Sequence, residues 1–403
     1  MSTLTDDLLG PARDLLPEVV ELRRTLHRHP ELGLDLPRTQ AAVLDALDGL
    51  GLELTVGERI SSVVADLDGG RPGPTILLRG DMDALPMPED TGLEFASTVD
   101  NTMHACGHDA HTAMLVGAAR LLAARRDELA GRVRFMFQPG EEGSGGAALM
   151  MDDGVLDGVD GAFAIHVAPN VPAGIVAWKP GAAMASADEI EIVVTGRGGH
   201  ASTPQWAADP VPATCELVLA LQSMVTRTVD VFDPAVLTVA QVTAGTTHNV
   251  IPESARLYGT LRAVSERTRR AVWERLRVVA DGVAAAHGCT AQVDIVQGYP
   301  VTTNDATFAR FAAGVVDDHL GPGRSYQMPS PVMGAEDFSY VLQQVPGAMV
   351  FLGVCPPEHA DPFSAPACHS NRMVLHEDVM ADGMALHAAV ATTFLARGGD
   401  ITT

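Results

Sequence analysis

The chain has 403 residues, 46% of them hydrophobic, and a formal net charge of −24. The apolar content is too high for a disordered chain. The length exceeds what a single hydrophobic core usually serves, so we expect two domains. The negative charge argues against a nucleic-acid partner, because phosphate-binding surfaces need basic patches. The acidic start lacks a signal pattern and no apolar run approaches about 20 residues, so we expect a cytoplasmic protein without a membrane partner. Five scattered cysteines predict reduced thiols.

The first part of the chain alternates helical and strand patterns. Apolar spacing predicts an amphipathic helix over residues 14–28, ended by Pro30 and Gly33, and a second over about 37–50. Short apolar runs then predict buried strands with the sequences SSVVADL, TILLRG, RVRFMFQ and GAFAIH. Strands separated by helices predict an α/β fold, in which a mixed sheet is covered by helices on both faces.

Polar side chains follow three of these strands. Asp81 and Asp83 follow TILLRG, Glu141 and Glu142 follow RVRFMFQPG, and His166 ends GAFAIH. Sites in α/β sheets gather at the carboxyl ends of strands, so we expect these side chains at one rim. The two aspartates could bind metal, orient a histidine or simply form a turn, and their spacing does not decide between these roles.

Residues 103–111, MHACGHDAH, concentrate three histidines, a cysteine and an aspartate beside this rim. Thiolate and imidazole are ligands that suit zinc and similar divalent metals. Cys106 and His108 are two residues apart and can point the same way on a looped backbone. The helical spacing that follows predicts a loop entering a helix. The competing interpretation is a free cysteine among scattered surface histidines.

The adjacent Glu141 and Glu142 lie in a glycine-rich turn, QPGEEGSGG. Adjacent carboxylates at a turn diverge, so one could bind metal while the other accepts a proton from an activated water. The alternative is a solvated acidic loop. By themselves, His166 and the late His369, in PACHSNR, are equally compatible with structural roles.

After Pro180 and Gly181 the pattern changes to β-α-β-β-α-β, the order of a ferredoxin-like layer. The expected elements are strands ADEIEIVVTG, VLTVAQVTAG, ESARLYGTLRA and TAQVDIV, with helices over about 210–229 and 265–287. We therefore predict an inserted domain over 184–297 and a larger domain from 1–183 and 298–403. Helices near 305–319, 336–345 and 377–397, with strand AMVFLGV, complete the larger domain.

The inserted domain carries three candidate substrate contacts. His200 lies on the glycine-rich loop GRGGHAS, and Asn249 precedes the strand that carries Arg262. An arginine fork suits a substrate carboxylate, although a surface charge on a strand is the alternative.

Several motifs taken together resemble the metal-dependent amidohydrolases of the aminoacylase and carboxypeptidase superfamily. The motifs are RRTLHRHPELG, RGDMDALP, MHACGHDAHTAML, FQPGEEGSGGA, GRGGHAS, NVIPESARLYGTLR, GAEDFSY and the late CHS. The resemblance extends from about residue 20 to 395 and is strongest to the hippurate hydrolases, N-acyl-amino-acid amidohydrolases and auxin-conjugate hydrolases.

The resemblance implies two divalent metal ions per subunit, Zn²⁺ or Mn²⁺, with Co²⁺ or Ni²⁺ also possible. The implied ligands are Cys106, His108, Glu142, His166 and His369. It also implies that Glu141 is the general base and that the smaller domain is a lid and dimerisation module. From a neighbouring subunit, His200 would polarise the scissile carbonyl, while Asn249 and Arg262 would hold the substrate.

Two positions depart from the family pattern. Ala110 stands where glycine is usual, and Cys368 precedes the late histidine where an apolar residue is more common. The second departure leaves open whether Cys368 joins the metal site.

We expect hydrolysis of N-acetyl, N-benzoyl or similar N-acyl amino acids by a homodimer or homotetramer. The alternatives are a dipeptidase or carboxypeptidase and, further off, a non-catalytic binding protein.

Overall fold

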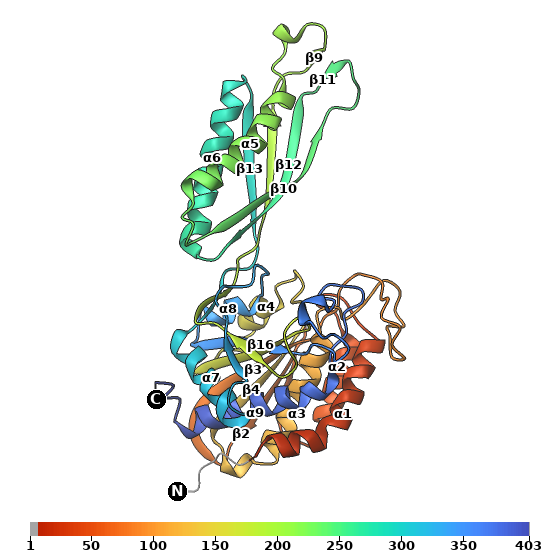
Figure 1. Ribbon diagram of the computed structural model, residues 1–403, viewed down its shortest axis with the longest axis vertical. Coiled ribbons are helices and arrows are strands. Elements are labelled where there is room, and N and C mark those ends of the chain that lie inside the picture. Colours follow the sequence, from red (N-terminus) through yellow and green to blue (C-terminus); the bar gives the residue numbers. More distant parts are fainter. Residues whose placement is uncertain (1–6, 403) are drawn as a thin grey trace. The chain divides into compact units, whose positions relative to one another are not determined.

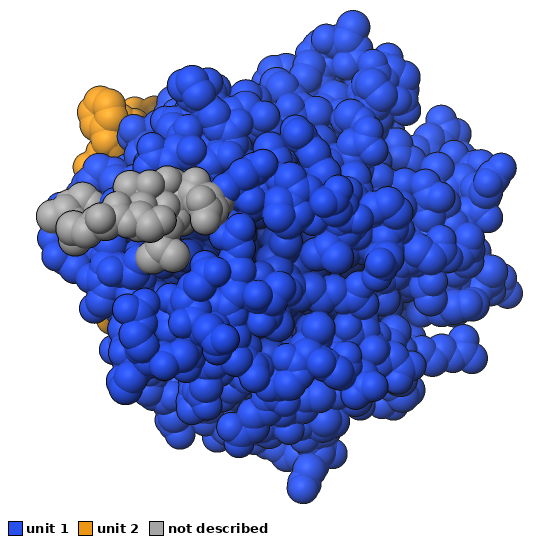
Figure 2. Space-filling view, turned by 90° about the horizontal axis from the view of Figure 1, so that it is seen from below, with its two compact units in different colours: residues 1–183, 303–330, 337–403 blue, residues 184–302, 331–336 orange. Residues whose placement is uncertain are grey.

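The computed structural model describes residues 7–402, which form two compact units. Within this range, unit 1 comprises residues 7–183, 303–330 and 337–402, and unit 2 comprises residues 184–302 and 331–336 (Figure 2). The short second stretch joins unit 2 through its backbone, because the amide of Ala185 donates to the carbonyl of Val332 over 3.0 Å.

Unit 1 contains an eight-stranded mixed sheet in the order β1-β2-β4-β3-β5-β16-β6-β15. Figure 1 labels β2, β3, β4 and β16 of this sheet. The bounds are β1 Glu53–Val56, β2 Val63–Asp68, β3 Arg71–Asp81, β4 Ala130–Gln138, β5 Gly161–Ala168, β6 Val176–Trp178, β15 Ser325–Gln327 and β16 Gly347–Gly353. The central strands β4, β3, β5 and β16 run parallel, while the pairs β1–β2, β2–β4 and β16–β6 are antiparallel. This confirms the predicted mixed sheet.

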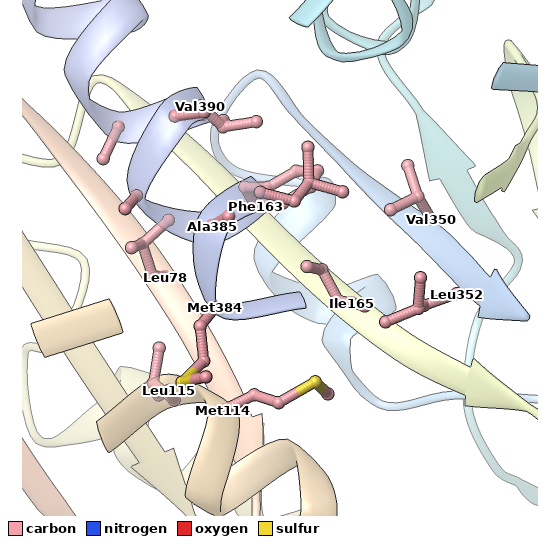
Figure 3. Packing of buried hydrophobic residues seen from close by; sticks show 14 of the residues in the cluster. Leu78, Met114, Leu115, Phe163, Ile165, Val350, Leu352, Met384, Ala385 and Val390 are labelled. Atoms are coloured by element: carbon pink, nitrogen blue, oxygen red, sulfur yellow. The ribbon is translucent and has the colours of Figure 1, made fainter. Parts of the chain in front are cut away.

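Helices cover this sheet. The helices are α1 Leu9–Arg28, α2 Pro37–Leu47, α3 His108–Ala123, α4 Gly146–Asp152, α7 Ala306–His319, α8 Phe338–Leu342 and α9 Met380–Ala396. Helices α1, α3 and α9 pack together and α9 lies on β3, β4 and β5. Figure 3 shows the resulting core, where Met384 of α9 lies beside Leu115 and Met114 of α3, and Ala385 of α9 lies beside Phe163 of β5. The opposite-facing Leu77 is equally buried, as expected for strands covered on both sides.

One helical segment corrects a sequence expectation. Residues 377–396 are long and apolar enough to cross a bilayer, which we did not predict. However, 83% of its apolar stretch is buried inside the protein, as in a helix of a protein core. The segment comprises the short 3-10 turn Glu377–Val379 followed by α9.

Unit 2 contains a four-stranded antiparallel sheet in the order β10-β12-β8-β13. Along the chain its elements are β8 Asp188–Thr195, α5 Pro210–Thr228, β10 Ala235–Ala244, β12 Ser254–Ala263, α6 Glu266–Ala286 and β13 Thr290–Gln297. Side chains of Asp209 and Ser265 cap the two helices by accepting from backbone amides. Alternate strand residues such as Ile190 and Ile192 pack with the helices, and their neighbours face away.

The predicted long elements are present, with shifted ends. Helix α1 begins five residues before the predicted start, because the Asp7 carboxylate accepts hydrogen bonds from the amides of Leu9 and Gly10. The short strands and helix α4 escaped prediction, because a few residues carry no clear period. They include the paired strands β7 Gly181–Met184 with β14 Thr302–Asn304, and β9 Gly199–His200 with β11 Val250–Ile251.

Candidate metal centre and active site

The parallel order β4-β3-β5 brings three strand ends to one edge of the unit 1 sheet. Asp81 ends β3, Glu141 follows β4 and His166 lies near the end of β5. Helix α3 begins at His108, directly after the loop that carries Cys106. The predicted rim is therefore present, because neighbouring parallel strands end on the same side.

His108 occupies the centre of this rim. Its side chain is fully buried, and neither ring nitrogen has a hydrogen-bond partner. Four carboxylates surround it instead: Nε2 lies 3.6 Å from Asp81, 4.0 Å from Glu141 and 4.0 Å from Glu142, and Nδ1 lies 3.5 Å from Asp83. Buried polar groups normally have hydrogen-bond partners, and buried charges are normally paired. A cation bound between this imidazole and the carboxylates would supply the missing partner.

The electrostatics of His108 point the same way. Burial alone opposes its protonation, but the charges of Asp81, Asp83 and Glu142 outweigh burial and hold the pKa of His108 well above its usual range. In the metal-free chain the proton on His108 is thus the positive charge that balances the carboxylates. A divalent ion would replace that proton, so the residues present fit a metal site.

Cys106 and His166 form a second part of the site. The Sγ atom of Cys106 lies 3.4 Å from Nε2 of His166. Nδ1 of His166 lies 2.7 Å from the carbonyl oxygen of Val167, which can only accept, so Nδ1 carries the proton. The lone pair of neutral His166 is therefore on Nε2, directed at the same space as the thiol, which is how proteins orient a metal-binding histidine.

A third group joins Cys106 to the end of the chain. Nε2 of His369 lies 3.2 Å from a carboxylate oxygen of Glu142. Possible ligand atoms of Cys106, Glu142 and His369 all lie within 4.8 Å of one another, and the same holds for Cys106, His108 and His166. Cys106 is common to both groups, so the sulfur lies between two sets of donors.

Asp83 holds the turn that carries the two glutamates. Its two carboxylate oxygens accept hydrogen bonds from the backbone amides of Glu141 and Glu142, each over 2.9 Å. Support of the neighbouring loop was not among the roles left open for Asp83, and one of the same oxygens also lies 3.5 Å from Nδ1 of His108.

Asp81 orients a histidine, which was one of the roles left open for it, but the histidine concerned, His111, was not singled out from the sequence. The amide of Val167 donates to Nε2 of His111 over 2.8 Å, so the proton of this ring is on Nδ1 and is donated to Asp81 over 2.6 Å. Burial lowers the pKa of His111 to about 4, which keeps the ring neutral. The spacing of His108 and His111 could have revealed His111 from the sequence, because residues three apart lie on the same face of a helix.

Cys368 of the late CHS motif lies beside Cys106, with its Sγ atom 3.9 Å from the carbonyl oxygen of Cys106. The neighbouring thiol is the main cause that raises the pKa of Cys106 and lowers the pKa of Cys368 to about 6. Whether Cys368 binds metal stays open.

In unit 2, the structure places His200 and Asn249 side by side. His200 pairs with Val250 between β9 and β11, and the amide of Ala201 donates to the carbonyl oxygen of Asn249. Nδ1 of the exposed His200 accepts from the amide of Ser202 over 3.1 Å, so a neutral His200 carries its proton on Nε2. The ring can thus donate a hydrogen bond outward.

Arg262 lies at the other end of the unit 2 sheet. Arg262 lies near the end of β12, where it pairs with Val236 of β10. The other end of β12, at Ser254, pairs with Thr195 of β8, which lies near the His200 loop. Eight strand residues span about 26 Å, so the described part of unit 2 does not bring Arg262 and His200 together.

One protein family matches most of the chain. Residues 77–393 match the family described as peptidase family M20/M25/M40.

Individual relatives share most of the chain. An N-acetylcysteine deacetylase of Bacillus subtilis (strain 168) is 42% identical over 336 residues, covering 83% of this chain and 88% of that protein. Thermostable carboxypeptidase 1 of Saccharolobus solfataricus is 35% identical over 395 residues, covering 97% and 99%. A crystal structure from Bacillus subtilis, described as a dinuclear metal-binding peptidase of the M20 family, aligns with a TM-score of 0.83 at 34% identity, covering 95% of this chain and 99% of that one.

Proposed function

The chain belongs to peptidase family M20/M25/M40 and is a hydrolase of amide bonds, and we propose that its substrates are N-acyl amino acids. Hydrolysis would release a carboxylic acid, such as acetate or benzoate, and the free amino acid. The similar deacetylase from Bacillus subtilis acts, by its name, on an amino acid of this form.

One observation carries the proposal that the site is metal-dependent. His108 is buried with no hydrogen-bond partner, although four carboxylates and the Cys106–His166 pair surround it. A non-catalytic structural cluster would satisfy these groups with one another, since unpaired buried polar atoms destabilise the fold. The two ring nitrogens of His108 instead lack a hydrogen-bond partner, as expected where a cation would complete the site.

We propose that two divalent ions bind per subunit, as in the dinuclear relative from Bacillus subtilis. The proposed ligands are Cys106, His108, Glu142, His166 and His369, with Cys106 shared because it belongs to both donor groups. A thiolate favours Zn²⁺, while the carboxylate and imidazoles also suit Mn²⁺, Co²⁺ or Ni²⁺. When bound, such ions polarise the acyl carbonyl and make water acidic enough to react near neutral pH.

Glu141 is the proposed general base. Its backbone is held by Asp83, and its carboxylate lies at the rim, 4.0 Å from His108, without belonging to the proposed ligand set. The carboxylate would take a proton from the attacking water and return it to the leaving amine, a role that needs one group near both.

The groups of unit 2 would act on the substrate. His200 can donate from Nε2 to the carbonyl oxygen as negative charge develops there, and Arg262 offers a fork for the carboxylate. Strand β12 spans about 26 Å from Ser254, at the end of the sheet near the His200 loop, to Arg262, so unit 2 of one chain does not bring both groups to one small molecule. We therefore propose a homodimer or larger assembly in which a neighbouring subunit supplies His200 and Asn249, with unit 2 serving as a ferredoxin-like lid.

The second candidate is a dipeptidase or carboxypeptidase, favoured by the similarity to a thermostable carboxypeptidase. Both substrate classes present an amide beside a free carboxylate, so the same site would serve both. A screen of metal-loaded protein separates them. N-acetyl, N-benzoyl and longer N-acyl amino acids are compared with dipeptides that share the same C-terminal residue. Hydrolysis confined to dipeptides would reject the N-acyl assignment, and no hydrolysis by protein with full metal content would reject both.

A further inference from the structure

Cys106 and Cys368 lie next to each other although 262 residues separate them in the chain. The Sγ atom of Cys368 lies 3.9 Å from the carbonyl oxygen of Cys106 and 3.8 Å from that of Val167. Their backbones are also joined, because the amide of His369 donates to the carbonyl of Ala105 over 2.7 Å. The α-carbons of Cys106 and Cys368 therefore flank one hydrogen bond between two backbone segments, and a disulfide requires α-carbons on such neighbouring segments.

The two cysteines differ in access. Cys106 is buried at 7% exposure, whereas Cys368 is half-buried beside His369, whose side chain is 56% exposed. A small oxidant arriving from solvent therefore meets Cys368 first, and the buried Cys106 stands behind it as a resolving thiol.

We propose that Cys106 and Cys368 form a redox modification site, at which a peroxide joins them in a disulfide and thereby releases the metal from the hydrolase. This inference rests on the proposed function, because it takes Cys106 as a metal ligand.

The chemistry balances with hydrogen peroxide as the oxidant. The sulfur of Cys368 attacks one peroxide oxygen, the O–O bond breaks, and a sulfenic acid and one water form. The sulfur of Cys106 then attacks the oxidised sulfur, the S–S bond forms, the S–O bond breaks, and the hydroxyl leaves as a second water. Two thiols and one peroxide give one disulfide and two waters, and a dithiol reductant reverses the change.

The effect on the site follows from the position of Cys106. A thiolate binds metal, but a disulfide sulfur carries no negative charge. Cys106 is the donor common to the group with His108 and His166 and to the group with Glu142 and His369. Oxidation of one sulfur would therefore weaken both groups together.

Zinc-loaded protein treated with hydrogen peroxide tests the proposal. A chromogenic chelator records released zinc, and unreduced tryptic peptides are mapped by mass spectrometry. We expect a Cys106–Cys368 cross-linked peptide, the loss of two of the five thiols and metal release accelerated about tenfold or more. Dithiothreitol followed by zinc should restore metal content.

Two variants provide matched controls. Cys368→Ala, or Cys368→Ser if the alanine variant is unstable, should keep zinc under the same peroxide treatment. Cys215→Ala removes the exposed thiol of α5 and should release zinc like the wild type. Release at the wild-type rate from the Cys368 variant, or no cross-linked peptide, would overturn the proposal. Protein that holds no zinc and hydrolyses nothing would instead refute the proposed function. Mass spectrometry of that metal-free protein after peroxide treatment would still show whether the Cys106–Cys368 disulfide forms.

Discussion

The candidate metal centre of unit 1 and the His200 loop of unit 2 hold their polar groups in opposite ways. In unit 1, His108 is fully buried and three strand ends converge on it. In unit 2, His200 and Asn249 are exposed on a two-residue strand pair and its adjoining loop. The comparison teaches that a buried group such as His108 is held in place by the elements packed around it, whereas exposed groups such as His200 depend on what approaches them.

This difference predicts where mutational effects will fall. Changes in unit 1 should alter metal content or the proton transfer beside it, and changes in the His200 loop should alter turnover alone. The predictions below test that division, beginning with the largest expected effect.

Glu141→Gln should keep the metal and lower turnover by about 10²–10⁴-fold, because glutamine keeps the shape but cannot accept a proton. Metal analysis and steady-state kinetics on the same preparation measure both effects. Glu142→Gln is the matched control and should lose metal instead. Near-wild-type turnover would remove Glu141 from the role of base and leave the rim as a metal site only.

His200→Ala should lower kcat by about 10²–10³-fold, the cost of one donor to a developing oxyanion, with unchanged metal content. His248→Ala, another exposed histidine of unit 2, should remain active. Kinetics and metal analysis of both variants distinguish a specific donor from a general effect of the unit 2 surface.

Mixing inactive His200→Ala and Glu141→Gln subunits sharpens the comparison further. Each mixed dimer would contain one site with its own Glu141 and the partner subunit's His200, so part of the activity should return. If labelled subunits exchange and activity stays at the level of the separate variants, His200 does not act across a subunit boundary. A fully active monomer in sedimentation would refute the shared site directly.

Cys106→Ser should weaken metal binding about 10–100-fold or more, because a serine hydroxyl stays protonated where a thiolate would bind. Metal retained after dialysis against a graded chelator gives the measurement. Cys289→Ser, a buried thiol of unit 2, is the control and should retain metal. Equal retention by the two variants would show that Cys106 is structural and make Cys368 the next thiol to test.

Metal affinity should fall as the pH is lowered, by about tenfold per pH unit for each proton displaced. The pKa of His108 is raised, so below that value the ring is protonated in the metal-free chain and must lose its proton to bind an ion. Titrations between about pH 6 and 8 measure the slope. Asp81→Asn, which removes one charge beside the ring, should shift the fall to lower pH. An affinity that does not change with pH would mean that no such proton is displaced.

Local patterns predicted most of the architecture. The long helices and strands carried clear apolar periods, and the split β-α-β-β-α-β order appeared in the spacing of unit 2. The Cys106–His108 window was visible because its ligand types are adjacent in the chain. Short elements such as β6 and β15 were missed because three residues contain no period, and their pairing comes from neighbouring strands.

The sequence by itself determined which chemical groups this protein carries and which of them share a loop, a helix face or a strand end, because those relations depend on local spacing. Only the tertiary structure decided how distant groups meet. The strand order β4-β3-β5 placed Asp83 under the Glu141 turn, and the return of the chain at His369 brought Cys368 against Cys106. Such contacts follow from how whole elements bury their apolar faces together, and no local pattern encodes that arrangement.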